Sequence, residues 1–179
     1  MSTELTRSSR AFLTARWQHL VLVNYAVEPE LLAPHLPPGL ELDLFEGKPH
    51  VSLVAFDFLD TRVLGVPWPG YRDFPEVNLR FYVRDGDTRG VAFIREYVPR
   101  RLIAAIARWL YNEPYSYAAM RSEVVAGPDA LTVSHWLDSG GHTGHLQVVA
   151  DPEPQVPADN SEAHFFKEHS WGYGTARNG

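Results

Sequence analysis

The chain has 179 residues, a formal net charge of −6 and no cysteine. This length fits one domain, and the negative charge disfavours nucleic acid or an anionic membrane as the main partner. The lack of cysteine excludes disulfides, thiol chemistry and thiolate metal sites.

The N-terminal segment is polar and has no apolar core, so we expect a flexible arm over residues 1–10 rather than a secretory signal. No apolar run approaches the roughly 20 residues that a membrane span requires. These features predict a cytoplasmic protein. The whole chain is 45% hydrophobic and 21% charged, an ordinary globular balance, and we expect residues 11–179 to form a single domain.

The first third of the domain is predicted to be mostly strand. Residues 12–27 follow a period of two with apolar side chains on both faces, which indicates a buried strand. A short helix starts at residues 28–32, with Pro29 in its first turn, and ends at Pro37-Pro38-Gly39. The strand-like runs 40–45 and 50–59 are joined by a glycine-containing turn and predict a hairpin.

The middle of the chain combines a long loop with a second hairpin. Residues 60–75 are rich in Gly and Pro and carry the aromatic anchors Trp68, Tyr71 and Phe74, and long loops in compact domains are often functional. The runs 76–83 and 90–98 predict a hairpin. An apolar stripe then predicts an amphipathic helix over residues 99–112.

Three more strands and a last helix are predicted in the final third. The strands cover 115–125, 130–137 and 145–149, and Ser161 caps a helix over 162–169. Many strands with two or three short helices predict an α+β, mostly β domain whose antiparallel strands form a barrel. The sequence stops just after the last helix, so we expect closing strands to be missing.

The most informative run is the strand 74–83. Because strand side chains alternate, Glu76, Asn78, Arg80 and Tyr82 share one face, and the opposite face is wholly apolar. The polar face either meets solvent or looks into a cavity of the barrel, and Tyr82 favours the cavity. In the cavity, Arg80 would pair with Glu76 or bind a carboxylate bidentately.

Four further side chains are candidates for the same pocket. Arg95 lies with aromatic neighbours on its strand and is either a stacked surface residue or a second anion clamp. Tyr115, Tyr117 and Arg121 share one face of the following strand. Core packing is an alternative role for either tyrosine, although a buried phenol needs a hydrogen-bond partner such as Glu76.

The eight histidines do not predict a metal site. None matches an H-E-x-x-H spacing, and His135 lies on an apolar strand face where a hydrogen-bonded core histidine is usual. His19 and Arg16 lie in the first strand region and can reach the pocket. The chain also has no G-x-S-x-G elbow, no P-loop and no G-x-G-x-x-G motif. We therefore expect no metal and no cofactor.

Five segments carry a family resemblance: residues 36–43, 51–56, 74–83, 114–115 and 165–169. Together they resemble the YqjF-like family of uncharacterised bacterial proteins, within the acetoacetate-decarboxylase-like superfamily. The resemblance runs from about Phe12 to Tyr173. It implies a β-barrel-like fold with an internal cavity, and family members usually continue with further strands.

The same resemblance bears on mechanism. The decarboxylase uses a Schiff-base lysine after a proline, next to a glutamate and an arginine. Glu76 looks like the counterpart of that glutamate, and Pro114-Tyr115 stands where the decarboxylase has Pro-Lys. A phenol cannot form a Schiff base with a ketone. The lysines of this chain, Lys48 in a turn and Lys167 on a polar helix face, are poor substitutes, so decarboxylation should be absent.

Three functions stay open at this point. The first is an enzyme that acts on a small carbonyl or carboxylate compound without a Schiff base. The second is a non-catalytic protein that binds a small molecule in the same pocket, and the third is a structural protein with a filled barrel. In the enzyme, Glu76 would be the acid or base, Tyr115 a proton donor or oxyanion partner, and Arg80 the carboxylate anchor. The sequence also allows the chain to form a homo-oligomer.

Overall fold

The computed structural model of the protein describes residues 13–63, 65–67, 70, 72–102, 104–105 and 114–174. The predicted arm over residues 1–10 and the anchors Trp68 and Tyr71 lie outside the described residues. No helix in the described part of the chain is both long and apolar enough to span a bilayer.

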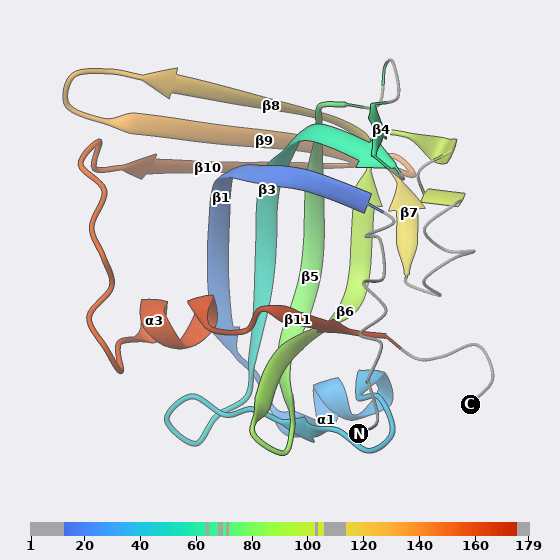
Figure 1. Cartoon of the computed structure of the whole chain (residues 1–179), viewed down its shortest axis with the longest axis vertical. Coiled ribbons are helices and arrows are strands. Elements are labelled where there is room, and N and C mark those ends of the chain that lie inside the picture. The colour runs from blue at the N-terminus through green and yellow to red at the C-terminus, as the bar shows by residue number, and fades with distance from the viewer. Residues whose placement is uncertain are drawn as a thin grey trace, which may run out of the picture.

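Most described residues belong to two β-sheets (Figure 1). The larger sheet contains β1 (Leu13–Ala26), β2 (Glu41–Leu42), β3 (His50–Val63), β4 (Val66–Pro67), β5 (Phe74–Asp85), β6 (Thr88–Val98), β7 (Tyr115–Tyr117) and β11 (Trp171–Tyr173). Its main order is β1-β3-β5-β6-β11, with β2 paired to β5, β4 to β3 and β7 to β6. The smaller sheet has the order β10-β9-β8 and contains β8 (Ala119–Ala126), β9 (Leu131–Ser139) and β10 (His142–Ala150).

The strand pairing corrects two details of the prediction. Most pairs are antiparallel, but β7 and β11 both run parallel to β6, so the sheet is not purely antiparallel. The pairings among the described strands form two separate sheets rather than one closed ring. The coarser prediction of a mostly β α+β fold with few helices is confirmed.

The second predicted hairpin is confirmed. The first is confirmed only at its turn, where Phe45 and Lys48 exchange two backbone hydrogen bonds of 3.0 Å. β5 and β6 pair antiparallel from Val77 opposite Tyr97 to Asp85 opposite Thr88. In the first case β2 pairs with β5 instead of β3. Residues beside β2 explain this, because Leu40 and Leu42 pack against the buried cluster of β5 and β6 on that side of the sheet.

The described helices are short. α1 (Pro29–Leu32) continues into the 3₁₀ turn η1 (Ala33–His35), and α3 spans Glu162–Lys167. The predicted cap of α3 is confirmed, because the backbone N–H of His164 donates to Ser161 Oγ at 3.1 Å. Of the helix predicted over 99–112, residues 101–102 and 104–105 are helical, and most of the remainder lies outside the described residues.

The larger sheet is covered differently on its two faces. α3 lies over one face, and the three-stranded sheet crosses behind the upper part of the other (Figure 1). We call these the α3 face and the inter-sheet face. Phe165 and Phe166 of α3 pack against Tyr82 and Val91, which places Tyr82 on the α3 face. Near α1, the inter-sheet face carries a cluster that includes Leu32, Phe81, Val83 and Ala92.

Candidate functional site

A row of polar side chains on β5 is buried on the α3 face. Glu76, Asn78 and Arg80 are only 2%, 3% and 7% exposed. We call these three residues the polar row. Their alternation with Val77 and Leu79 puts them on one side of the strand, as the sequence predicts. Because all three are buried, the alternative of a solvent-facing strand is wrong.

The polar row lies between two apolar clusters on the same face. At one end, Phe74 belongs to a buried cluster with Phe56 and Ala104. At the other end, Tyr82 packs with Phe166 at 4.7 Å between ring centroids. Apolar packing at both ends keeps water from the row, and charged groups held away from water interact strongly with any partner.

The contacts within the row leave polar atoms available. Asn78 Nδ2 donates to Glu76 Oε1 at 3.1 Å, which orients that carboxylate. Within the described residues, Asn78 Oδ1 and Arg80 Nε have no hydrogen-bond partner, and no ion pair joins Arg80 to Glu76. A buried polar atom without a partner is costly, so native structures rarely keep one without a reason.

A second carboxylate, missed by the sequence analysis, lies beside the row. Glu96 of β6 is 1% exposed and stands opposite Asn78 in the β5–β6 register. The signal was present in the predicted hairpin, because pairing the two strands places Glu96 against a polar residue. The α3 face therefore holds two buried carboxylates, an amide and a guanidinium on neighbouring strands.

Tyr82 follows the polar row on the same face of β5 and takes part in a separate hydrogen-bond network. Ser52 Oγ lies 2.5 Å from Asn24 Oδ1, to which it donates, and 2.5 Å from the Tyr82 hydroxyl. Since the serine proton is used on Asn24, the Tyr82 hydroxyl donates to Ser52. The ring also contacts His169 at 4.7 Å between centroids. Tyr82 is thus held firmly at the end of the row.

Tyr115 reaches the same face, whereas the other three candidates do not join the row. Tyr115 packs against the cluster at the Glu76 end and lies opposite Glu96 in the register of β6 and β7. Arg95 is exposed and donates to Ser116 Oγ at 3.3 Å, in line with the surface alternative. Tyr117 is exposed under the guanidinium of Arg101, at 4.7 Å.

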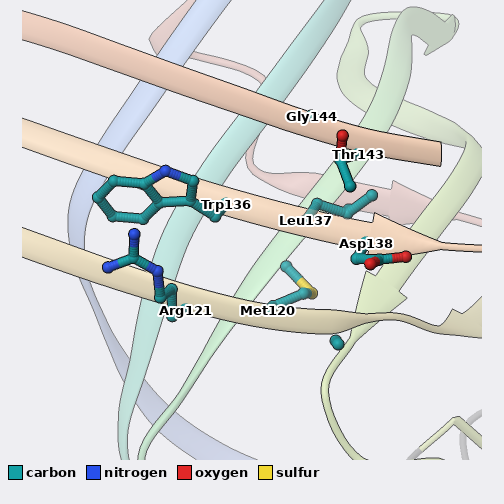
Figure 2. A pocket seen from close by; sticks show the side chains of 8 residues that line it. Met120, Arg121, Trp136, Leu137, Asp138, Thr143 and Gly144 are labelled. Carbon is teal, nitrogen blue, oxygen red and sulfur yellow. The ribbon is translucent and has the colours of Figure 1, made fainter. Parts of the chain in front are cut away.

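Arg121 lies on the smaller sheet, where it lines a cavity. Figure 2 shows its guanidinium beside the indole of Trp136, with a carbon-to-centroid distance of 3.4 Å. The ring of His145 stacks on the same indole at 4.6 Å. This cavity of about 310 Å³ is lined by Ala119, Met120, Arg121, Trp136, Leu137, Asp138, Thr143 and Gly144.

Another polar cluster, between the two sheets, was also missed. Ser122 Oγ donates to Asp57 Oδ1 at 2.6 Å, and His19 Nδ1 lies 3.1 Å from Asp57 Oδ2. His19 adopts a φ of 53° beside an irregularity in β1, which turns it toward Asp57. These residues are far apart in the chain, so no sequence pattern could have linked them.

His135 lies beside that cluster and corrects a prediction. It is 2% exposed, and within the described residues neither ring nitrogen has a hydrogen-bond partner. The prediction of a hydrogen-bonded core histidine is therefore wrong. Burial lowers the pKa of His135 below its usual 6.5; the Asp57 carboxylate opposes this, and His19 adds to it. In the described residues, no group of three or more His, Asp or Glu is arranged to hold a metal ion.

Comparison with known sequences gives a family match and one curated relative. A model of the DUF2071 family, described as "Uncharacterized conserved protein", matches residues 14–179. The "Uncharacterized protein YqjF" of Bacillus subtilis (strain 168) is 34% identical over 108 residues. Those residues are 60% of this chain and 45% of that protein.

Solved structures with a similar fold include acetoacetate-decarboxylase-like enzymes. Acetoacetate decarboxylase from Legionella pneumophila matches 86% of this chain with a TM-score of 0.58 and 19% identity. The enduracididine biosynthesis enzyme MppR, complexed with pyruvate, matches 78% with a TM-score of 0.58 and 16% identity. The chain covers 53% and 57% of these two proteins, so it spans about half their length, and the likeness establishes the fold alone.

Proposed function

We propose that this chain, which the match over residues 14–179 makes a member of the DUF2071 family, binds a small carboxylate compound at its polar row. The observation that carries the proposal is Arg80, a buried guanidinium without an ion-pair partner in the described residues. A carboxylate would supply the missing charge and accept two parallel hydrogen bonds. Asn78, whose Oδ1 is also available, would bind a donor on the same ligand.

The ligand class that fits best is a 2-oxo acid. MppR, which shares the fold, has been crystallised with pyruvate, a molecule with one carboxylate and one adjacent carbonyl. On the polar row, Arg80 would anchor the carboxylate and Glu76 would lie at the far side of Asn78, near the carbon next to the carbonyl. A buried carboxylate at that place can act as an acid or a base.

Any chemistry would proceed without a Schiff base from this chain. Lys48 is exposed in the turn before β3, and Lys167 is exposed and bonded to Glu168 at 2.6 Å. We propose instead that Glu76 removes a proton next to the carbonyl and that Tyr115 donates to the resulting oxyanion. We also propose that the α3 face is the interior of a barrel, as in the fold that the chain resembles.

Titration with pyruvate tests the binding step. We expect pyruvate to raise the melting temperature of the protein, because a ligand that binds only the folded state stabilises it. Arg80→Met should abolish this shift. Arg84→Met is the matched control, because Arg84 lies on the same strand but is exposed and paired with Glu41 at 3.0 Å. No shift, or the same shift in both variants, would refute a carboxylate site at Arg80.

Proton exchange then separates an enzyme from a binder. Pyruvate incubated with the protein in D₂O should lose its methyl proton signal faster than in buffer, and Glu76→Gln should slow this exchange to the buffer rate. Binding with no acceleration of exchange would identify a non-catalytic binding protein. Exchange that Glu76→Gln leaves unchanged would remove Glu76 from the mechanism.

A further inference from the structure

A second cavity lies between the two sheets, on the side of β5 opposite the polar row. It has a volume of about 410 Å³ and is lined by Tyr25, Leu53, Val77, Asn78, Leu79, Tyr97, His135, Leu137, Gly144, His145 and Leu146. Val77 and Leu79 come from the inter-sheet face of β5, and the opposite wall is formed by β9 and β10. A volume of this size holds one small organic molecule.

The residues that line this cavity are mostly apolar, and two of them, His135 and Asn78, are deeply buried polar residues. Aliphatic side chains from both sheets line it, together with the rings of Tyr25, Tyr97 and His145. Both ring nitrogens of His135 lack a partner within the described residues, whereas Asn78, a member of the polar row, donates its Nδ2 to Glu76 Oε1. Mostly apolar walls with one polar group that fixes orientation are the usual composition of a small-molecule site.

The charges around the cavity select an uncharged ligand. Among the residues that the structure describes, no Lys or Arg lines it, so an anion would have no countercharge there. Asp57 is close enough to act on His135 and would repel a negative group. The same carboxylate is already bonded to Ser122 and His19, at 2.6 and 3.1 Å, and does not line the cavity as a partner for a cation.

We infer that the inter-sheet cavity binds an uncharged aromatic molecule that carries a hydrogen-bonding group, with His135 as the polar anchor. The ring of the ligand packs among Tyr25, Tyr97 and the aliphatic side chains, where offset or edge contacts between rings are favourable. A neutral imidazole has one donor and one acceptor nitrogen, so His135 can bind a carbonyl, a hydroxyl or an amide. Asn78 of the polar row also lines this cavity, but the inference rests on His135 and does not depend on the function proposed for the polar row.

Three ring compounds that differ in charge test the inference. Benzamide is uncharged, benzoate is an anion and benzylamine is a cation near pH 7.5. We expect benzamide to raise the melting temperature, to shift the ¹⁵N resonances of the His135 ring, and to bind at least tenfold more tightly than either charged compound. Benzoate that binds as tightly as benzamide, or benzamide that leaves the His135 resonances unchanged, would overturn the inference.

Two variants locate the binding. Leu79→Trp fills the cavity from a half-buried position, and His135→Phe removes the anchor but keeps a ring of similar size. Either change should weaken benzamide binding at least tenfold, whereas the exposed-site variant Arg84→Met should bind it like the unaltered protein. Pyruvate titrated into Leu79→Trp shows whether the polar row is intact. Sedimentation tests whether a second copy of the chain covers this cavity. A dimer that dissociates in Leu79→Trp would show that it does and would contradict the inference.

Discussion

The two faces of β5 have opposite relations between polarity and burial. The polar side chains Glu76, Asn78 and Arg80 are 2–7% exposed, whereas the apolar Val77 and Leu79 on the other face are only half-buried beside a cavity. An antiparallel strand with one polar and one apolar face usually turns the polar face to solvent. Here the composition of a face does not reveal its exposure.

The difference between the faces arises from what covers them. Phe165 and Phe166 of α3 pack beside Tyr82 at one end of the polar row, and Phe56, Phe74 and Ala104 form a buried cluster at the other end. On the other face, the smaller sheet crosses the strands at a steep angle (Figure 1), and its side chains leave a gap of about 410 Å³. Dense packing supports the first face, and the second contributes less to stability.

The largest expected effect is therefore on the α3 face. Phe56 is 1% exposed and contacts Phe58 and Trp17 at 5.0 and 4.8 Å between ring centroids. Phe56→Ala should lower the free energy of unfolding by about 3–5 kcal/mol, the usual cost of a large cavity in a core. Leu79→Ala, on the half-buried side, should cost only about 1 kcal/mol. Urea unfolding of both variants measures the difference, and equal costs would mean that the two faces are packed alike.

The next effect distinguishes a functional polar row from a structural one. If Arg80 serves a ligand, Arg80→Met should raise the free energy of unfolding by about 1–4 kcal/mol, because an apolar side chain replaces a buried charge that has no ion-pair partner within the described residues. The same variant should no longer bind pyruvate. A loss of about 3–5 kcal/mol would instead indicate that Arg80 completes a buried ion pair required for folding. Arg84→Met, at the exposed end of the strand, is the control for the loss of one positive charge.

Local sequence patterns predicted the elements of this comparison but not their environment. Alternation placed Glu76 and Arg80 together, and the Ser161 cap and the β5–β6 hairpin were also foreseen, because each depends on residues close in the chain. The contact of Ser122 with Asp57 joins residues from different sheets, and nothing local specifies it. Periodicity shows which side chains share a face, whereas the element that covers the face is decided by tertiary packing.

The same limit explains the error at His135. The sequence placed it correctly on the apolar face of β9, but the hydrogen-bond partner expected for a core histidine is missing within the described residues. Whether a buried imidazole finds a partner depends on the opposite wall, here Leu79 and Val77 of β5, which bring no polar side chain. The sequence of its own strand therefore cannot predict whether a histidine on an apolar face has a hydrogen-bond partner.

The smallest expected effect concerns the pH dependence of stability on the inter-sheet side. Burial holds the pKa of His135 below the 6.5 of an unfolded chain, so the unfolded state binds more protons between the two values. The contribution of His135 is thus fully present above pH 6.5 and is lost as the pH falls through the folded pKa. Asp57 and His19 act on this group in opposite directions, and both lie outside β9.

Unfolding by urea at pH 7.5 and pH 5.5 measures this contribution by difference. Burial also lowers the pKa of His169, so the unaltered protein loses stability at the lower pH from more than one site. His135→Gln should lose less stability between the two pH values than the unaltered protein, whereas His35→Gln, at an exposed turn, should lose as much. If His135→Gln loses just as much, the imidazole is not held neutral by burial, and the uncharged wall on which the inter-sheet ligand site depends is not there. A reduced loss would show that burial keeps His135 neutral, as the inter-sheet ligand site requires.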